Sequence, residues 1–262
     1  MSATLIPSRL AYIERGTGLP VVLLHGFPLD NHVWDPQIEE LSRDYRVIAP
    51  DLSGFGESRC GDPFTMQDQA DDVHQLLVQI GALPCVLAGL SMGGYVSLAY
   101  WKKYPATLKG LIFVDTRASA DNSEGKAGRM RMAQVAREKG SAPIADEMLG
   151  KMITEATVRQ NPDLRDRVLK MMQSCPPRTI ENALLAMRDR EDHECELPSI
   201  GVPTLVIVGD KDPIISKDTA RCMAESIPQG RLVVIPEAAH LPQLEKPQEV
   251  NQAMHEFLKT VH

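Results

Sequence analysis

Eight short apolar runs recur along the 262-residue chain, and stretches with a helical spacing of apolar residues separate them. Runs such as VVLL (21–24), LIFV (111–114) and LVIV (205–208) show no polar alternation, which is typical of strands in a mostly parallel sheet covered by helices on both faces. The sequence therefore predicts an α/β fold with an eight-stranded, mostly parallel sheet. The predicted strands are residues 3–6, 9–15, 20–26, 45–51, 84–90, 108–115, 203–210 and 231–237.

Helices are expected over residues 68–80 and 248–258, where apolar side chains fall on one stripe. The alternation of strand and helix stops after Asp115, because residues 117–195 contain no convincing strand and are rich in helix formers and charges. Gly and Pro at positions 140, 143, 150, 162, 176 and 177 predict breaks between about four helices there. We therefore expect a core formed by residues 1–116 and 196–262, with residues 117–195 inserted as a helical cap.

Charge and cysteine content exclude several classes of protein. With 28 Lys and Arg against 35 Asp and Glu, the formal net charge is −7, which argues against a nucleic-acid partner and against a polybasic membrane anchor. The five cysteines form no CxxC pair, and His193 with Cys195 lacks further ligands nearby, so no disulfide framework and no metal are expected. Pro7, Arg9 and Glu14 interrupt any apolar stretch that a signal peptide would need, so a cytoplasmic location is expected.

The segment Gly89-Leu90-Ser91-Met92-Gly93 stands between a predicted strand and a predicted helix. A G-x-S-x-G sequence in that context is typical of a nucleophile elbow, in which a strained turn raises the serine hydroxyl at the end of the sheet. Small neighbours are required in such a turn, and the two glycines supply them. We therefore expect Ser91 to be a nucleophile.

A serine hydroxyl needs a base and an acid that orients the base. Asp212 follows the strand at 203–210, and His240 follows the strand at 231–237, so the chain order is Ser, Asp, His, as this elbow requires. Asp210 and Asp115 compete for the role of the acid. Asp212 is favoured because the acid of this motif lies a few residues beyond the end of its strand.

The loop after the strand at 20–26 is the expected second half of the site. Acyl transfer places negative charge on the substrate oxygen, which two preorganised N–H groups must stabilise. The backbone amides of Phe27 and of Met92, the residue after the nucleophile, are the expected donors. His25 is expected to hold this loop by hydrogen bonds without reacting.

Four motifs in series resemble those of the α/β-hydrolase fold superfamily, and the resemblance extends from about residue 8 to residue 261. They are HGFP (25–28), DLSGFGES (51–58), GLSMGG (89–94), and GDKD (209–212) together with AAHLPQLEKP (238–247). The glycines at 54 and 56 are expected to shape a turn at the mouth of the site. The resemblance implies a hydrolase with a Ser91–His240–Asp212 triad that needs neither a metal nor an organic cofactor.

Ser91 separates the chain from haloalkane dehalogenases and epoxide hydrolases, which carry an aspartate at that position. Residues 25–58 and GLSMGG are most similar to the subgroup that contains 3-oxoadipate enol-lactonases and cofactor-free haloperoxidases. Hydrolysis of small carboxylic esters or lactones is therefore expected. The same triad leaves four alternatives open: an enol-lactonase, a perhydrolase, a carbon–carbon bond hydrolase, or a ligand receptor with slow turnover.

Substrate contacts are predicted from position in the chain. Phe27, Trp34 and Leu241 flank the motif loops and are expected to line an acyl pocket. Arg117 stands at the base of the predicted cap, where it either faces a substrate carboxylate or forms a salt bridge that anchors the cap. The expected partner is a small-molecule ester or lactone, and the sequence leaves a homo-oligomer open.

Overall fold

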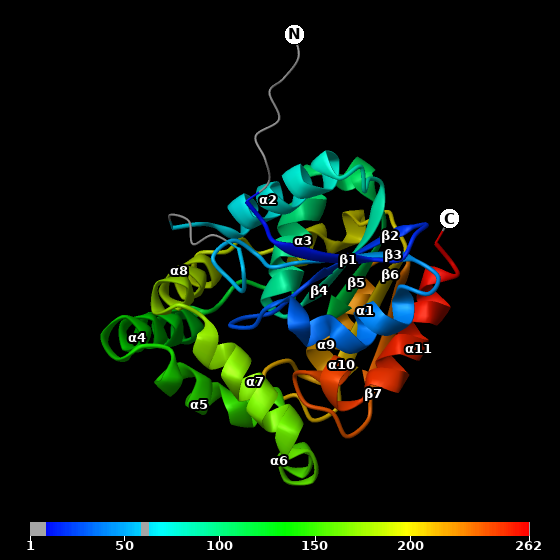
Figure 1. Ribbon diagram of the computed structural model, residues 1–262. Helices are drawn as coiled ribbons and strands as arrows, with labels where there is room; N and C mark the ends of the chain where they lie inside the picture. The colour runs from blue at the N-terminus through cyan, green and yellow to red at the C-terminus, as the bar shows by residue number, and fades with distance from the viewer. Residues whose placement is uncertain (1–8, 59–62, 262) are drawn as a thin grey trace.

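One sheet lies at the centre of the molecule, with its strands in the order β1-β3-β2-β4-β5-β6-β7 (Figure 1). This computed structural model describes residues 9–58 and 63–261, and in them the strands are Tyr12–Arg15 (β1), Pro20–Leu24 (β2), Arg46–Pro50 (β3), Cys85–Leu90 (β4), Leu108–Val114 (β5), Thr204–Gly209 (β6) and Gly230–Ile235 (β7). Only β1 runs antiparallel to its neighbour. The predicted α/β fold is confirmed, with seven strands in the described residues; the predicted strand at 3–6 lies outside them.

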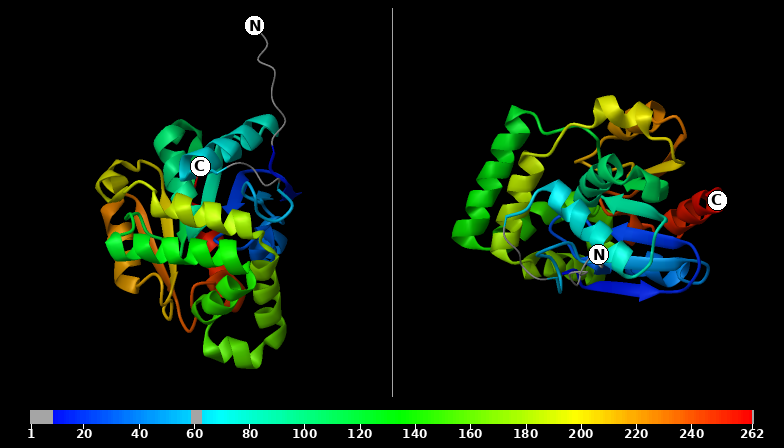
Figure 2. Two further views of the ribbon diagram at one scale, coloured as in Figure 1. Left: turned by 90° about the vertical axis from the view of Figure 1, so that its left-hand side faces the viewer. Right: turned by 90° about the horizontal axis from the view of Figure 1, so that it is seen from above.

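The strands in the middle of the sheet are apolar on both faces because helices cover both. All residues of β4 and β6 are buried, whereas β7 at the edge is partly exposed. The helices of the core are Asp35–Leu41 (α1), Met66–Gln79 (α2), Met92–Lys103 (α3), Lys217–Ser226 (α9), Pro242–Glu245 (α10) and Pro247–Leu258 (α11). Helices α1 and α11 pack together on one face and α2 and α3 on the other (Figures 1 and 2). Short 3-10 helices occupy Asn31–Trp34, Pro105–Thr107 and Glu194–Ser199.

The two helices predicted from apolar spacing are present. Helix α2 begins earlier than the periodicity suggested because Thr65 and Asp68 form a reciprocal capping box ahead of the first apolar turn. No helix in the described part of the chain is both long enough and apolar enough to cross a membrane.

Between β5 and β6 the chain forms a group of helices beside the sheet (Figures 1 and 2). They are Ser123–Lys139 (α4), Ala142–Met152 (α5), Glu155–Gln160 (α6), Pro162–Ser174 (α7) and Pro177–Arg188 (α8), five where about four were predicted. The additional element is the short α6, which begins after Thr154 because that side chain accepts a hydrogen bond from the Thr157 amide. The break predicted at Gly150 was wrong: this exposed glycine lies inside α5, which continues to Met152.

Register brings the carboxyl ends of three strands to one edge of the sheet. Leu90 of β4 pairs with Val114 of β5, and Val114 in turn pairs with Ile207 of β6. The residues that follow these strands therefore lie close together although they are far apart in sequence. In open α/β sheets, ligands bind outside this carboxyl edge.

Candidate active site

Ser91 occupies a strained turn between β4 and α3. Its φ of +50° and ψ of −112° lie in a region that residues with a side chain rarely adopt. A Cβ added to Gly89 would lie 2.3 Å from the carbonyl oxygen of Gly93, and one added to Gly93 would lie 2.4 Å from that of Leu24. No side chain fits at either position, so the two glycines are what allow the turn to form.

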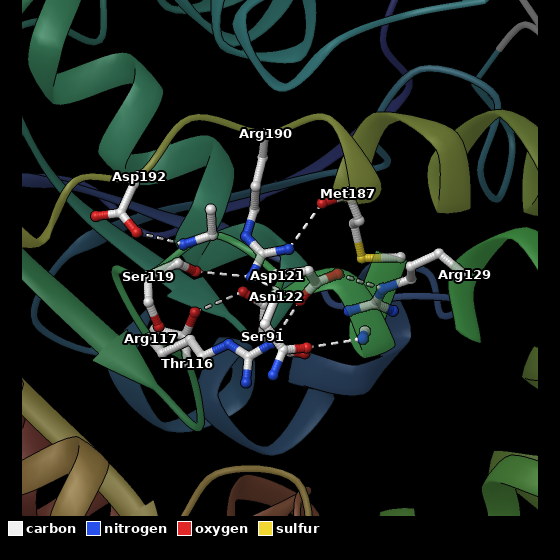
Figure 3. A network of polar contacts seen from close by, with 12 residues as sticks. Ser91, Thr116, Arg117, Ser119, Asp121, Asn122, Arg129, Met187, Arg190 and Asp192 are labelled. Atoms are coloured by element: carbon white, nitrogen blue, oxygen red, sulfur yellow. Dashed lines mark hydrogen bonds and ion pairs between the residues drawn. The ribbon is translucent and has the colours of Figure 1, made fainter. Parts of the chain in front are cut away.

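The end of β5 fixes the position of this turn. The Ser91 amide donates to the carbonyl of Val114 at 2.9 Å, and the Thr116 hydroxyl donates to the carbonyl of Ser91 at 2.8 Å. Figure 3 shows Thr116 beside Ser91. No local motif marks Thr116, because its contact with the elbow depends on the pairing of β5 with β4.

Asp212 and His240 form a buried pair. Nδ1 of His240 lies 2.7 Å from Oδ2 of Asp212, and their side chains are 2% and 0% exposed. Oδ1 of Asp212 accepts a hydrogen bond from the Ile214 amide at 2.7 Å. Burial by itself raises the pKa of Asp212, but the charge and hydrogen bond of His240, together with hydrogen bonds from Asp115 and the Ile214 amide, hold that pKa below its usual value.

The other two candidate acids lie differently. Asp210 accepts a hydrogen bond from the Glu237 amide at 2.7 Å and lies near the Lys211 ammonium. Asp115 lies beside Asp212, but it is Asp212 that is hydrogen-bonded to His240. Of the three carboxyls, Asp212 is the one bonded to His240, and its role as the acid stays a prediction. Among the residues that the structure describes, no hydrogen bond joins the Ser91 hydroxyl to His240, whose ring nitrogen Nδ1 is taken up by Asp212.

The loop that carries Phe27 lies against the elbow. A Cβ built on Gly26 would be 3.2 Å from the Ser91 Cβ. In the described part of the chain the Phe27 amide donates no hydrogen bond, and Met92, as the first residue of α3, has no acceptor one turn earlier. These two amides are therefore free to bind a developing oxyanion beside the serine.

His25 holds this loop, as the sequence predicted. Its Nδ1 lies 3.0 Å from the carbonyl of Gly26, and its Nε2 accepts a hydrogen bond from the Leu52 amide at 2.9 Å. Burial lowers the pKa of His25 in spite of the opposing charge of Asp51. A neutral ring satisfies both bonds, so His25 is a structural clamp. The turn at 54–56 is fixed similarly by Asp51, whose Oδ2 accepts from the Glu57 amide at 2.9 Å.

The predicted pocket residues are well inside the protein. Trp34 and Leu241 are each 0% exposed and Phe27 is 3% exposed, so they form packed walls and present little surface to a substrate. Their contribution to an acyl pocket stays a prediction.

Arg117 pairs with a protein carboxylate. Its guanidinium lies 2.5 Å from Asp121, and Arg129 and Arg190 lie 3.1 and 3.0 Å from the same carboxylate (Figure 3). Asp121 precedes α4, Arg129 lies inside α4 and Arg190 follows α8, so this cluster ties the two ends of the helical segment together. Arg117 makes the salt bridge that was the alternative to a substrate contact.

Asp121 should stabilise the fold measurably. Burial raises its pKa, but the hydrogen bonds and charges of Arg190 and Arg129 prevail and lower it to about 2. Because the folded-state pKa is depressed, this stabilisation is present above the unfolded value of about 4 and is lost as the pH falls toward 2. Asp121→Asn should lower the free energy of unfolding at pH 7 by about 2 kcal/mol, measured by urea denaturation.

The control is Asp189→Asn, because Asp189 pairs with Arg188 but its side chain is 60% exposed. Asp189→Asn should lower the free energy of unfolding by less than about 1 kcal/mol. If the two variants lost equal stability at pH 7, or if Asp121→Asn had the same acid sensitivity as the wild type, the assignment to Asp121 would be wrong.

Glu245 makes contacts that its place in the sequence does not predict. One oxygen accepts from the Ala239 amide at 2.6 Å, and the other from the hydroxyls of Thr154 and Thr157 at 2.8 and 2.6 Å. This carboxylate therefore joins the loop of His240 to the start of α6. The signal was present, since Glu245 lies within the motif at 238–247, but its partners are 88 and 91 residues away.

Comparison with known proteins identifies the family to which the fold belongs. A family model of the alpha/beta hydrolase fold matches residues 20–247. The AB hydrolase superfamily protein YisY of Bacillus subtilis is 31% identical, and the match covers 92% of each chain. The 3-oxoadipate enol-lactonase 1 of Acinetobacter baylyi is 25% identical, over 92% of this chain and 89% of its own.

Among solved structures, a thermophilic esterase from Thermogutta terrifontis, with malate bound, superposes with a TM-score of 0.94 at 45% identity, over 97% of this chain and 94% of that one. The residues that the family model matches, 20–247, include the elbow, the Asp212–His240 pair and the loop at 25–28. The chain belongs to the alpha/beta hydrolase fold family.

Proposed function

We propose that the protein is a serine hydrolase that cleaves small carboxylic esters or lactones without a metal or organic cofactor. The observation that carries the proposal is the buried 2.7 Å contact between Asp212 and His240 at the same edge of the sheet as the strained Ser91. Similarity to an esterase at 45% identity supports ester substrates, and similarity to an enol-lactonase at 25% identity supports lactones.

In this mechanism His240 removes the Ser91 proton while Asp212 orients the ring and stabilises the imidazolium. The serine oxygen attacks the carbonyl carbon, and the amides of Phe27 and Met92 bind the oxyanion. His240 then gives its proton to the leaving alcohol, which leaves an acyl-enzyme. Water, activated by the same histidine, releases the acid and restores the serine.

We further propose that residues 117–195 act as a cap that selects the substrate, on a core of residues 1–116 and 196–262. Glu245 supports this role, because it connects the loop of His240 to Thr154 in the helical segment. The proposed location is the cytoplasm, the proposed partner is a small molecule, and neither nucleic acid nor a membrane is involved.

The proposal is tested with a fluorophosphonate and with p-nitrophenyl acetate, butyrate and octanoate. We expect a single phosphonyl adduct in the intact mass, located on Ser91 by peptide mapping, and turnover of at least the shorter esters. Adding 3-oxoadipate enol-lactone to the series separates a lactonase from a general esterase. Labelling at another residue would contradict the proposal, and labelling of Ser91 without turnover of any substrate would favour the ligand receptor.

A further inference from the structure

Asp115 is a buried carboxyl that the proposed mechanism does not use. It follows β5 with a φ of +43°, a left-handed conformation that is uncommon outside glycine, and it is 0% exposed. Asp115, Asp212 and His240 each place a nitrogen or oxygen atom within 4.8 Å of the other two. A strained acidic residue in contact with a catalytic pair requires a physical reason.

The hydrogen bonds of Asp115 are incomplete for a carboxylate. Oδ1 accepts from the Gly209 amide at 3.0 Å, whereas Oδ2 is buried and meets no donor within the described residues. A buried oxygen that is ionised but receives no hydrogen bond is costly. A proton on Oδ2 removes that cost, because it turns the oxygen into a donor, and the neighbouring carboxylate of Asp212 is an acceptor within reach.

We propose that Asp115 is a neutral carboxylic acid whose Oδ2–H donates a hydrogen bond to the Asp212 carboxylate, which makes Asp115 a positioning residue for the Ser91–His240–Asp212 triad. The inference rests on the proposed function. Asp212 then receives three kinds of donor: the His240 ring, the Ile214 amide and the Asp115 hydroxyl. These fix the direction of both of its oxygens.

The electrostatics assign the proton to Asp115 rather than to Asp212. Two adjoining buried carboxyls cannot both ionise at neutral pH. Burial, with the charges of Asp212 and of Glu245 on α10, raises the pKa of Asp115 well above its usual value, while His240 helps to lower that of Asp212. One negative charge, on Asp212, therefore lies beside His240. The hydrogen bond that the Asp115 hydroxyl donates to Asp212 disperses part of that charge.

Infrared spectroscopy tests the protonation state without requiring turnover. At pH 7 the difference spectrum between the wild type and Asp115→Asn should show loss of the C=O stretch of a protonated carboxylic acid. The control spectrum, with Asp210→Asn, should show loss of carboxylate bands instead. If Asp115→Asn also removed carboxylate bands only, the proposal would be overturned, whatever the substrate of the enzyme.

The pH dependence of kcat/KM for p-nitrophenyl acetate, measured in the presence of EDTA, tests the positioning role. Asparagine keeps both an acceptor for the Gly209 amide and a donor to Asp212, so Asp115→Asn should retain the acidic limb of the wild type. Asp115→Ala removes the donor and concentrates the charge of Asp212, so the limb should move to higher pH by about one unit. Turnover of Asp115→Asn should exceed that of Asp115→Ala by about tenfold or more.

The possible outcomes are distinct. A limb that is unmoved in a folded Asp115→Ala, or moved equally in both variants, would overturn the positioning role. Loss of activity in EDTA that a divalent cation restores would also overturn it, because the two carboxyls would then hold a metal. A wild type inactive on all three p-nitrophenyl esters and on the enol-lactone would refute the proposed function, and the infrared comparison would still decide the state of Asp115.

Discussion

Ser91→Ala should lower kcat/KM for p-nitrophenyl esters by about ten-thousand-fold to a million-fold while the protein stays folded. The alanine cannot form an acyl-enzyme, so only the catalysis supplied by substrate binding and by the amides of Phe27 and Met92 remains. The remaining rate should still exceed that of the uncatalysed reaction in buffer. The measurement is steady-state hydrolysis, with thermal unfolding recorded on the same samples.

Ser174→Ala is the matched control for this variant. Ser174 is exposed and its hydroxyl only donates to the carbonyl of Lys170 one turn earlier in α7, so its loss should leave turnover within about twofold of the wild type. Serine and alanine both carry a Cβ, so the backbone strain at position 91 is similar in the two proteins. The thermal midpoint of Ser91→Ala should therefore stay close to that of the wild type. A folded Ser91→Ala that kept a tenth of the wild-type rate would show that another group is the nucleophile.

The sequence predicts the parts of this site that depend on local chain geometry. Ser91 is recognisable because Gly89 and Gly93 are the residues that a tight strand-to-helix turn requires, and their close contacts explain why no other residue would do. The backbone amides of Phe27 and Met92 are predicted as oxyanion donors from the same sequence motifs. For such positions, residue type and neighbours along the chain contain the physical constraint.

The interactions that sequence reasoning missed are all between distant segments. Thr116 bonds to the elbow because β5 pairs with β4, and Glu245 joins His240 to α6 through partners about ninety residues away. The state of Asp115 depends on its burial beside Asp212, 97 positions later in the numbering. Chain order makes Asp115 a candidate acid, but it does not show that the Asp115 and Asp212 carboxyls adjoin, so this contact emerges only from the fold.

The helical segment shows the same limit in its secondary structure. Its prolines mark true helix starts at α7 and α8, since a proline in the first turn costs no hydrogen bond. Gly150 did not mark a break, because a single exposed glycine costs a helix only about 1 kcal/mol, which the packing of α5 against α7 offsets. Residue propensity therefore predicted the ends of helices correctly at the prolines, where one helix stops and the next begins in a new direction, and wrongly at Gly150.

Asp212→Asn should lower kcat by about ten-thousand-fold. The amide is nearly the same size as the carboxylate, so packing is kept, but it can present its NH2 group to Nδ1 of His240. The ring then carries its proton on Nε2, the nitrogen that must accept the serine proton. The loss of negative charge also removes the stabilisation of the imidazolium that forms as Ser91 attacks. KM should change far less than kcat, because Asp212 does not touch the substrate.

Asp210→Asn is the control that separates this effect from a general loss of negative charge at the end of β6. Asp210 lies two residues away and bonds to the Glu237 amide, which an asparagine oxygen can also do, so kcat should stay within about twofold of the wild type. If Asp210→Asn lost as much activity as Asp212→Asn, orientation of His240 by one carboxylate would not explain catalysis. If Asp212→Asn stayed active while Asp115→Asn did not, Asp115 would be the acid of the triad and its proposed neutral state would be wrong. The two asparagine variants thus decide which of two adjoining carboxyls carries the charge on which the histidine depends.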